Sequence, residues 1–153
     1  MFQKWGHSAA LFFYSVSFYV LIPVIITRLL FKSLKAPAYR IRLRERWGFV
    51  PRRSDENLVF WVHAVSVGES VAATPMIKAL CATNRELRVH VTCMTPTGSQ
   101  RIRSIFSDQL GKAITHSYAP YDLPDSVRRF LGRIRPDMLI VMETELWPNI
   151  ISL

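Results

Sequence analysis

The sequence lacks the glycine-rich loops with which many nucleotide-binding proteins hold phosphate. Its 153 residues include six scattered glycines, at positions 6, 48, 68, 98, 111 and 132. Neither the Gly-x-Gly-x-x-Gly pattern of dinucleotide-binding folds nor the glycine and lysine pattern of a P-loop occurs. These absences argue against a dehydrogenase that uses a dinucleotide and against a nucleoside triphosphatase.

Cysteines and metal-ligand patterns are also scarce. Cys81 and Cys93 are too few for a disulfide framework and are best interpreted as reduced, buried residues. The four histidines are scattered, and neither cysteine has a ligand partner nearby, so we expect no metal and no cofactor. One histidine, His63, stays of interest because it lies three residues before Ser66 at a predicted strand end.

Charge is missing from one long stretch near the N-terminus. The 20 residues from Ser8 to Thr27 carry none, and a helix of that length rises about 30 Å, the thickness of a bilayer's hydrocarbon core. We therefore expect a membrane anchor over residues 1–31. A cleaved signal peptide fits less well, because the apolar run is long and no Ala-x-Ala site follows it. A shallow, partly inserted helix, favoured by Pro23, Ser15 and Ser17, stays open as an alternative to a spanning one.

Positive charge is concentrated directly after this stretch. Residues 28–53 contain nine lysines and arginines against Glu45 alone, whereas the other residues are almost balanced. Such a cluster stays in the cytoplasm and is attracted to an anionic membrane surface. We expect a basic juxtamembrane helix at Ala36–Trp47 within a segment that spans residues 32–57. No nucleic-acid-binding motif accompanies the arginines, so we expect no nucleic-acid partner.

The rest of the chain alternates between apolar runs and helical patterns. The expected strands are 58–63, 87–93, 113–117 and 138–142, and the expected helices are 69–83, 98–106 and 123–133. This alternation predicts an α/β fold with a Rossmann-like parallel sheet over residues 58–153. Right-handed crossovers place all strand C-termini at one edge. Because the chain stops a few residues into a helix that starts near Trp147, we expect this domain to be incomplete and the chain to be a fragment.

Carboxylates and hydroxyls follow the predicted strands at that edge. Ser66 and Glu69 fit a capping box, but a carboxylate there is also placed to act as a general base, in a different rotamer. Gly68 permits a ligand to approach the backbone closely. Glu143 and Glu145 follow the last strand and face the same way if the chain is still extended there.

Two further turns have a simpler interpretation. Thr95, Thr97 and Gly98 form a strand-to-helix turn whose hydroxyls either cap the helix or bind a sugar or phosphate. Asp122 is interpreted as the N-cap of the helix that follows it, and we assign it no chemistry.

In their order along the chain these segments resemble the Kdo (3-deoxy-D-manno-octulosonic acid) transferases of lipopolysaccharide synthesis. The resemblance rests on six segments. Two lie in the basic region: Lys-Ala-Pro-Ala-Tyr-Arg at 35–40 and Arg-Glu-Arg-Trp-Gly-Phe at 44–49. Four lie in the predicted sheet domain: Trp-Val-His-Ala-Val-Ser-Val-Gly-Glu at 61–69, Thr-Cys-Met-Thr-Pro-Thr-Gly-Ser at 92–99, Pro-Tyr-Asp-Leu-Pro at 120–124 and Met-Glu-Thr-Glu-Leu-Trp-Pro-Asn at 142–149. It implies the N-terminal, acceptor-side half of a two-domain glycosyltransferase of the GT-B type, attached to the inner (cytoplasmic) membrane of a Gram-negative-type bacterium.

The resemblance also implies a reaction and roles for residues. Such enzymes transfer Kdo from CMP-Kdo to a hydroxyl of a lipid A precursor, with inversion and without a metal. Glu69 would be the general base, and Glu143, or as second choice Glu145, would assist at the transition state. The substrate-binding residues would be Ser66, Gly68, Thr95, Thr97 and Gly98. The donor-binding domain is missing from this chain, so we expect CMP-Kdo binding only if that domain is supplied, and no transfer by the chain alone. The alternative is a non-catalytic, membrane-bound module that binds lipid or a partner.

Overall fold

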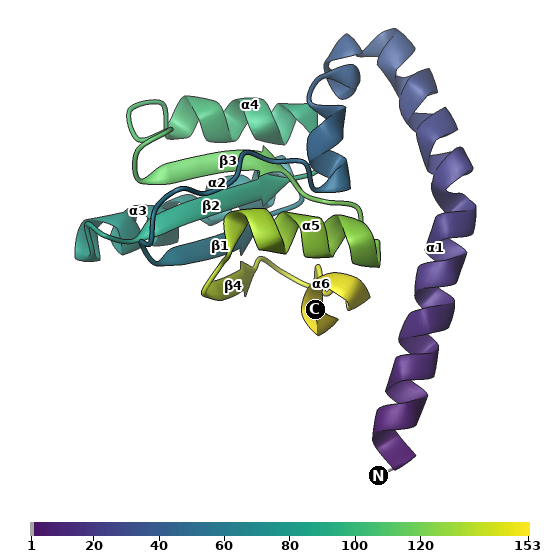
Figure 1. Ribbon diagram of the computed structural model, residues 1–153. Coiled ribbons are helices and arrows are strands. Elements are labelled where there is room, and N and C mark those ends of the chain that lie inside the picture. Colours follow the sequence, from purple (N-terminus) through teal and green to yellow (C-terminus); the bar gives the residue numbers. More distant parts are fainter. Residues whose placement is uncertain (1) are drawn as a thin grey trace.

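The computed structural model describes the backbone of residues 2–153 and the side chains of residues 9–153. A long helix, α1 (Phe2–Lys35), leads through two short 3-10 helices, η1 (Pro37–Arg40) and η2 (Leu43–Trp47), into an α/β domain (Figure 1). The domain contains the elements β1 (Val59–His63), α2 (Val67–Ala72), α3 (Thr74–Thr83), β2 (Arg88–Cys93), α4 (Pro96–Ile105), β3 (Ile114–Tyr118), α5 (Pro124–Ile134), β4 (Met138–Val141) and α6 (Pro148–Ser152).

The four strands form a parallel sheet in the order β3-β2-β1-β4, which confirms the predicted fold class. The chain first moves outward from β1 to β2 and β3, and then returns to place β4 on the other side of β1. The connections therefore diverge between β1 and β4. In open parallel sheets, ligands bind beyond the strand C-termini at such a switch point.

Two apolar cores cover the two faces of the sheet. On one face, Val62 and Val91 pack beneath Ile77 of α3 and Ile102 of α4. On the other face, Trp61 packs against α5, with its ring centroid 4.7 Å from that of Phe130. Burial of this kind contributes about 1.5–3 kcal/mol for each large apolar side chain. The strands are therefore fixed from both sides, and the loops at their C-termini are held in a defined arrangement.

The predicted helix at residues 69–83 is in fact two helices. Helix α2 ends at Ala72, and α3 starts at Thr74 with Pro75 in its first turn. Proline has no backbone N–H and cannot continue the hydrogen-bond ladder of the preceding turn. The other strands and helices predicted over residues 58–153 agree with the structure to within two residues.

The basic segment before the sheet differs from the expected regular helix. Arg42 adopts a left-handed conformation with φ of 60° and separates η1 from η2. Its guanidinium donates to Glu45 at 2.6 Å, to Ser99 Oγ at 3.1 Å and to the carbonyl of His116 at 3.0 Å. These contacts pull the chain onto the domain, which explains why one continuous helix does not form.

Gly48 joins η2 to helix α5 by close approach. Its φ is +79°, and a Cβ atom there would lie 2.2 Å from the carbonyl oxygen of Ser126 and 3.0 Å from the nitrogen of Phe130. Only glycine fits both this backbone conformation and this contact. The segment between α1 and the sheet is therefore part of the packed domain.

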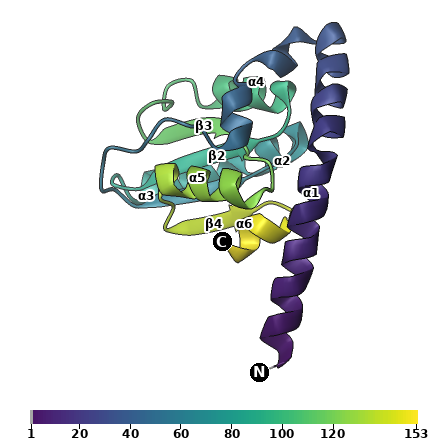
Figure 2. The same ribbon diagram turned by 45° about the vertical axis from the view of Figure 1, so that its right-hand side comes forward.

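Helix α1 runs along the side of the domain toward which the strands point, and it does so in both views (Figures 1 and 2). Within the described residues, Ala9–Lys35 is the one stretch long and apolar enough to cross a membrane, with a mean hydropathy of 2.2. Only 6% of its most apolar window is buried, so α1 is not a core helix. The helix continues past residue 31, where the expected anchor ends, to Lys35.

Candidate functional site

The loops after β1 and β4 lie next to each other at the switch point. Strand β1 pairs with β4, which places His63 beside Val141 at their C-terminal ends. The N–H of Met142 donates to the carbonyl of His63 at 2.9 Å and extends this pairing beyond the strand. The residues that follow β1 and those that follow β4 are therefore held at one edge of the sheet, as the sequence predicts.

Glu69 lies in the first turn of α2 and forms the predicted capping box. The hydroxyl of Ser66 accepts a hydrogen bond from the N–H of Glu69 at 3.2 Å, and Glu69 Oε1 accepts from the N–H of Ser66 at 3.1 Å. A further bond, which the sequence does not reveal, runs from the N–H of Val65 to Glu69 Oε2 at 2.8 Å. The side chain is 5% exposed, so these bonds hold a buried carboxylate in one position.

The capping rotamer does not exclude a role as a base. Each carboxylate oxygen has two lone pairs, and each oxygen of Glu69 accepts one backbone N–H. Each oxygen therefore keeps one lone pair for a proton. Nearby, Gly68 is exposed, and the nearest atom to an added Cβ would be Ser66 Oγ at 3.8 Å. Packing does not require glycine there, and the backbone is open to solvent.

Thr95, Thr97 and Gly98 follow β2 and form the start of α4. Thr95 Oγ1 accepts from the N–H of Gly98 at 3.1 Å, so it acts as the helix cap. A Cβ atom on Gly98 would lie 3.0 Å from that hydroxyl, which makes the turn tight. Thr97 is exposed and lines a cavity of about 410 Å³ between η1 and α4. Among these three residues, Thr97 is the one open to a ligand.

Glu143 and Glu145 do not form the expected extended pair. Glu143 has a φ of 57°, so the chain turns there, and its side chain is exposed. Glu145 is half-buried and accepts a hydrogen bond from Trp147 Nε1 at 2.8 Å. The two carboxylates therefore differ: Trp147 holds Glu145 in place, whereas Glu143 lies at the tip of a turn.

His63, the last residue of β1, contacts residues of β2 and of the loop that follows β4. Its Nδ1 lies 3.0 Å from Thr92 Oγ1, and its ring centroid lies 5.0 Å from that of Trp147. Among the described residues its Nε2 has no hydrogen-bond partner. Burial lowers the pKa of His63 to about 4, although the negative charge of Glu69 acts in the opposite direction. His63 is therefore neutral near pH 7 and supports Trp147, which in turn holds Glu145.

Asp122 is buried and corrects the expectation that it caps α5. Helix α5 has Leu123 as its N-cap, and no side chain caps it. The carboxylate of Asp122 instead accepts from the N–H groups of Asn149 at 3.1 Å and Ile150 at 2.8 Å, in the first turn of α6. Asn149 returns a bond from its side-chain amide to the carbonyl of Asp122 at 2.6 Å. This pair fixes α6 directly after the loop that carries Glu145.

Two arginines of the basic segment are held by the domain: Arg46 is buried inside it, and Arg42 is half-buried at its edge. Arg46 is 2% exposed, donates to the carbonyl of Met94 at 2.8 Å and lies 4.3 Å from the ring centroid of Tyr118. Arg42 is held by Ser99 and by the carbonyl of His116. The charge count alone gave no sign of this, because buried and exposed arginines look alike in a sequence. These two charges stabilise the edge of the sheet and do not face a membrane.

No three histidine, cysteine, aspartate or glutamate side chains of the described residues lie together in a way that could hold a metal ion. The expectation that the reaction needs neither a metal nor another cofactor stays a prediction.

The parallel sheet with helices on both faces fits the N-terminal domain of a two-domain glycosyltransferase of the GT-B type. Residues 41–153 match the family model described as 3-deoxy-D-manno-octulosonic-acid transferase (kdotransferase). The chain belongs to this Kdo transferase family.

Individual relatives agree with the family model. The chain is 42% identical over 141 residues to the 3-deoxy-D-manno-octulosonic acid transferase of Haemophilus influenzae, which covers 92% of this chain and 32% of that protein. It is 33% identical over 133 residues to a probable mitochondrial transferase of the same name from Arabidopsis thaliana, covering 87% of this chain and 29% of that protein. The transferase of Bordetella pertussis is 41% identical over 93 residues, covering 60% of this chain and 21% of that protein. The chain thus spans a third or less of the length of these relatives.

Proposed function

We propose that this chain supplies the acceptor side of a Kdo transferase that acts in lipopolysaccharide synthesis at the inner membrane of a Gram-negative-type bacterium. The reaction moves Kdo from CMP-Kdo to a hydroxyl of a lipid A precursor, with inversion at the anomeric carbon. CMP-Kdo binding requires a donor-binding domain. Membership of the family supports the proposal, and the apolar helix α1 supports attachment to a membrane.

The observation that carries this proposal is the position of Glu69. Its carboxylate is buried at the switch point and is held by the N–H groups of Val65 and Ser66. As general base, Glu69 takes the proton of the acceptor hydroxyl while that oxygen attacks the anomeric carbon and CMP departs. Such a base contributes roughly 10²–10⁴-fold in rate. Of the proposed substrate-binding residues, Ser66, Gly68 and Thr97 contact the acceptor in this proposal, and Thr95 and Gly98 form the turn that presents Thr97.

The experiment compares two variants of the chain joined to the donor-side remainder of the H. influenzae relative. Glu69→Gln should lower Kdo transfer to a lipid A precursor by roughly 10²-fold or more, as expected for loss of a base. The matched control is Ser70→Ala, which removes the bond from Ser70 Oγ to the carbonyl of Ser66 at 2.7 Å in the same turn and leaves every carboxylate in place.

A loss that is equally large in both variants would assign Glu69 to capping alone. The 153-residue chain without the added domain serves as a further arm, in which we expect no transfer. Measurable transfer by this arm would contradict the proposal that CMP-Kdo needs a second domain.

A second carboxylate assists at the transition state, and the structure favours Glu145 over our first choice, Glu143. Glu145 is fixed by Trp147 Nε1, and a fixed charge stabilises a transition state better than a mobile one. Trp147→Phe keeps a ring against His63 but removes this donor. If Glu145 is the assisting group, Trp147→Phe and Glu145→Gln should both reduce the rate of transfer more than Glu143→Gln does. The reverse order would restore Glu143 as the assisting residue.

A further inference from the structure

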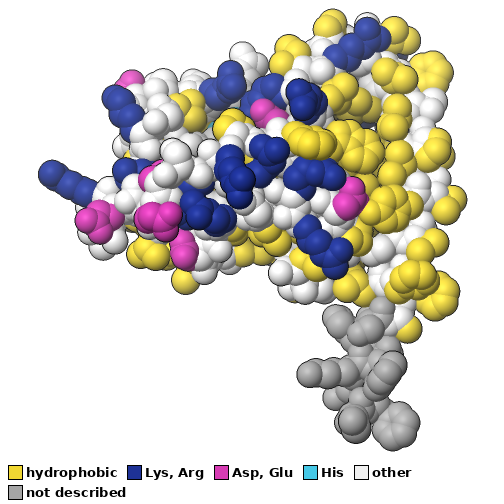
Figure 3. Space-filling view, in the orientation of Figure 1, with side chains coloured by type: hydrophobic (Ala, Val, Ile, Leu, Met, Phe, Trp, Pro, Cys, Tyr) yellow, Lys and Arg dark blue, Asp and Glu magenta, His cyan; other side chains and the backbone are white. Residues whose placement is uncertain are grey.

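Helix α1 presents one uniformly apolar outer face. Its most exposed large side chains include Phe13 (69%), Val20 (71%), Val24 (61%) and Phe31 (67%). Spacings of seven, four and seven residues place these four side chains within about 20° of one line along an ideal helix. This face lies opposite the buried Ser15 and Ser33, and Figure 3 shows hydrophobic side chains along the described part of α1.

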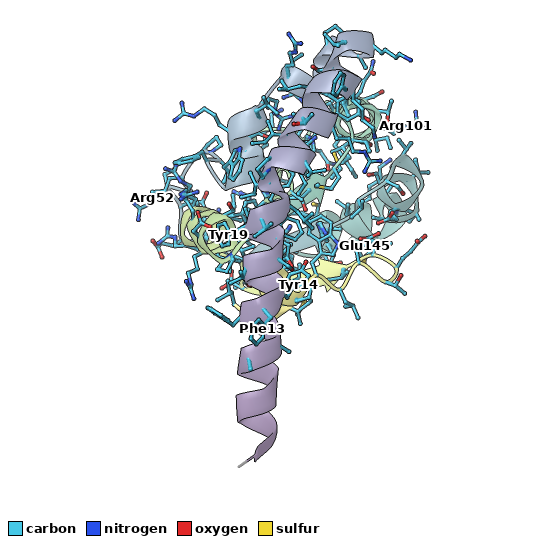
Figure 4. All side chains as sticks on the ribbon, turned by 90° about the vertical axis from the view of Figure 1, so that its right-hand side faces the viewer. Phe13, Tyr14, Tyr19, Arg52, Arg101 and Glu145 are labelled. Atoms are coloured by element: carbon cyan, nitrogen blue, oxygen red, sulfur yellow. The ribbon has the colours of Figure 1, made fainter. Side chains whose placement is uncertain are left out.

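The opposite face of α1 rests on the domain. Ser15 and Ser33 are buried there, and Leu11, Ile22 and Leu29 on the same side are half-buried. The hydroxyl of Ser15 lies 3.1 Å from Asn149 Oδ1, and Tyr19 donates to the carboxylate of Asp125. Figure 4 shows α1 in front of the domain, with Tyr14 and Tyr19 on the stretch that crosses it.

These contacts are incompatible with a spanning orientation of the same helix. In a spanning helix Ser15 would lie roughly 10 Å from one end of the uncharged stretch and 18 Å from the other. Asn149 and Asp125, which contact α1 at this level, would then lie inside the hydrocarbon core together with the start of α5. Burying a charge such as that of Asp125 at the bilayer centre costs about 2.5–3.5 kcal/mol on insertion scales. A docked α1 therefore cannot cross the bilayer.

We propose that α1 stays docked and lies in the plane of an anionic membrane leaflet, with its outer face among the acyl chains. This inference rests on the membrane attachment proposed above and gives it an orientation. Amphipathic helices in this position sink about 5–10 Å into the boundary between headgroups and acyl chains. Arg28, Lys32 and Lys35 are exposed near the C-terminal end of α1, where they meet anionic headgroups.

This orientation brings the functional site to the lipid. Helix α1 runs past the side of the domain to which the strands point, so the loop that carries Glu69 faces the same leaflet as α1 (Figures 1 and 2). A lipid acceptor would then meet the site while its acyl chains stay in the bilayer. The N-terminus would also stay on the same side of the membrane as the domain.

Nitroxide labels on single cysteines measure the orientation directly. In a Cys81→Ser background, the full chain carries one label at position 13, 20, 24 or 31 in vesicles of phosphatidylethanolamine and phosphatidylglycerol. Cys93 can stay, because it is fully buried and burial raises its thiol pKa to about 11. A label at Ser15 reports on the face of α1 that is docked on the domain. A label at the exposed residue Asp108 gives the reference value for full exposure to water. Depth is read from the collision rates of each label with oxygen and with a water-soluble nickel complex.

A helix in the membrane plane places all four outer labels at one shallow depth and shields the label at position 15 from lipid. A spanning helix places Val20 near the bilayer centre and Phe31 about 16 Å closer to water, because 11 residues separate them. That gradient, or lipid contact at position 15 equal to that at position 20, would overturn the orientation while leaving attachment intact. Failure of the chain to float with the vesicles would refute attachment itself, and the orientation with it.

Discussion

Gly48 gives the sharpest test of how the segment before the sheet packs. Alanine at this position would have to keep a φ of +79° and would place its Cβ 2.2 Å from the carbonyl oxygen of Ser126. The left-handed conformation costs roughly 1–2 kcal/mol for a residue with a Cβ, and overpacking against a backbone costs roughly 1–3 kcal/mol. We expect Gly48→Ala to lower the free energy of unfolding by about 2–5 kcal/mol.

Two other glycines separate these contributions. Gly111 has a φ of +77° but no atom within 4 Å of an added Cβ, so Gly111→Ala should show the conformational cost alone, about 1–2 kcal/mol. Gly132 lies in α5 with open space around it, so Gly132→Ala should stabilise the protein by about 0.5–1 kcal/mol. The three substitutions are thus chemically the same, yet two are expected to destabilise the protein to different extents and one to stabilise it.

Urea unfolding in detergent micelles, followed by the circular dichroism of the backbone and by tryptophan fluorescence, measures the three variants against the parent chain. The expected order of stability is Gly132→Ala, parent, Gly111→Ala and then Gly48→Ala. If Gly48→Ala costs no more than Gly111→Ala, the contact between η2 and α5 is not tight. The account of Gly48 as a close-approach residue would then be wrong.

Two further changes test the buried polar groups. Asp122→Ala leaves the N–H groups of Asn149 and Ile150 without their acceptor, so we expect the free energy of unfolding in urea to fall by about 2–4 kcal/mol. The control Asp108→Ala, at an exposed site, should change that free energy by no more than about 0.5 kcal/mol. Equal effects of the two substitutions would contradict the capping role of Asp122. Because burial lowers the pKa of His63 from 6.5 to about 4, the unfolded chain takes up this proton first as the pH falls. The contribution of neutral His63 to stability is therefore complete above pH 6.5 and is lost between pH 6.5 and 4, to the extent of about 3 kcal/mol. Burial also lowers the pKa of His90 to about 3 and of His116 to about 4, so these two histidines add to the slope in the same window. His63→Asn should therefore reduce the pH dependence of unfolding without removing it, and an unchanged slope would refute this explanation.

Most of the fold could be predicted from local sequence patterns. Apolar runs located β1 and β4. The alternation with helical patterns located β2 and β3, whose sequences Arg-Val-His-Val-Thr-Cys and Ile-Thr-His-Ser-Tyr contain polar residues. The capping box at Ser66 and Glu69 was also readable, since its partners stand three residues apart. Family resemblance supplied the roles proposed for the glutamates, which no pattern of spacing gives by itself.

Contacts between residues far apart in the chain could not be predicted from the sequence. Asp122 has an ordinary capping sequence around it, yet its partners are 27 and 28 residues away, in α6. Arg46 resembles its exposed neighbours in sequence, but it lies buried against Met94 and Tyr118. Such choices depend on which surfaces the completed sheet brings together, and the sequence around each residue does not contain that information.

The contacts of the basic segment also determine the order in which the protein is able to fold during synthesis. Glu45 accepts from the N–H of Tyr118, 73 residues later, and Arg42 donates to the carbonyl of His116, 74 residues later. At about 5–20 residues per second, a ribosome needs roughly 4–15 s to make that length of chain. During this interval Arg42 and Arg46 have no partners in the sheet, because these partners have not yet been made. The nascent chain is therefore more positively charged at its surface than the folded protein, which favours early contact of the newly made anchor with an anionic membrane.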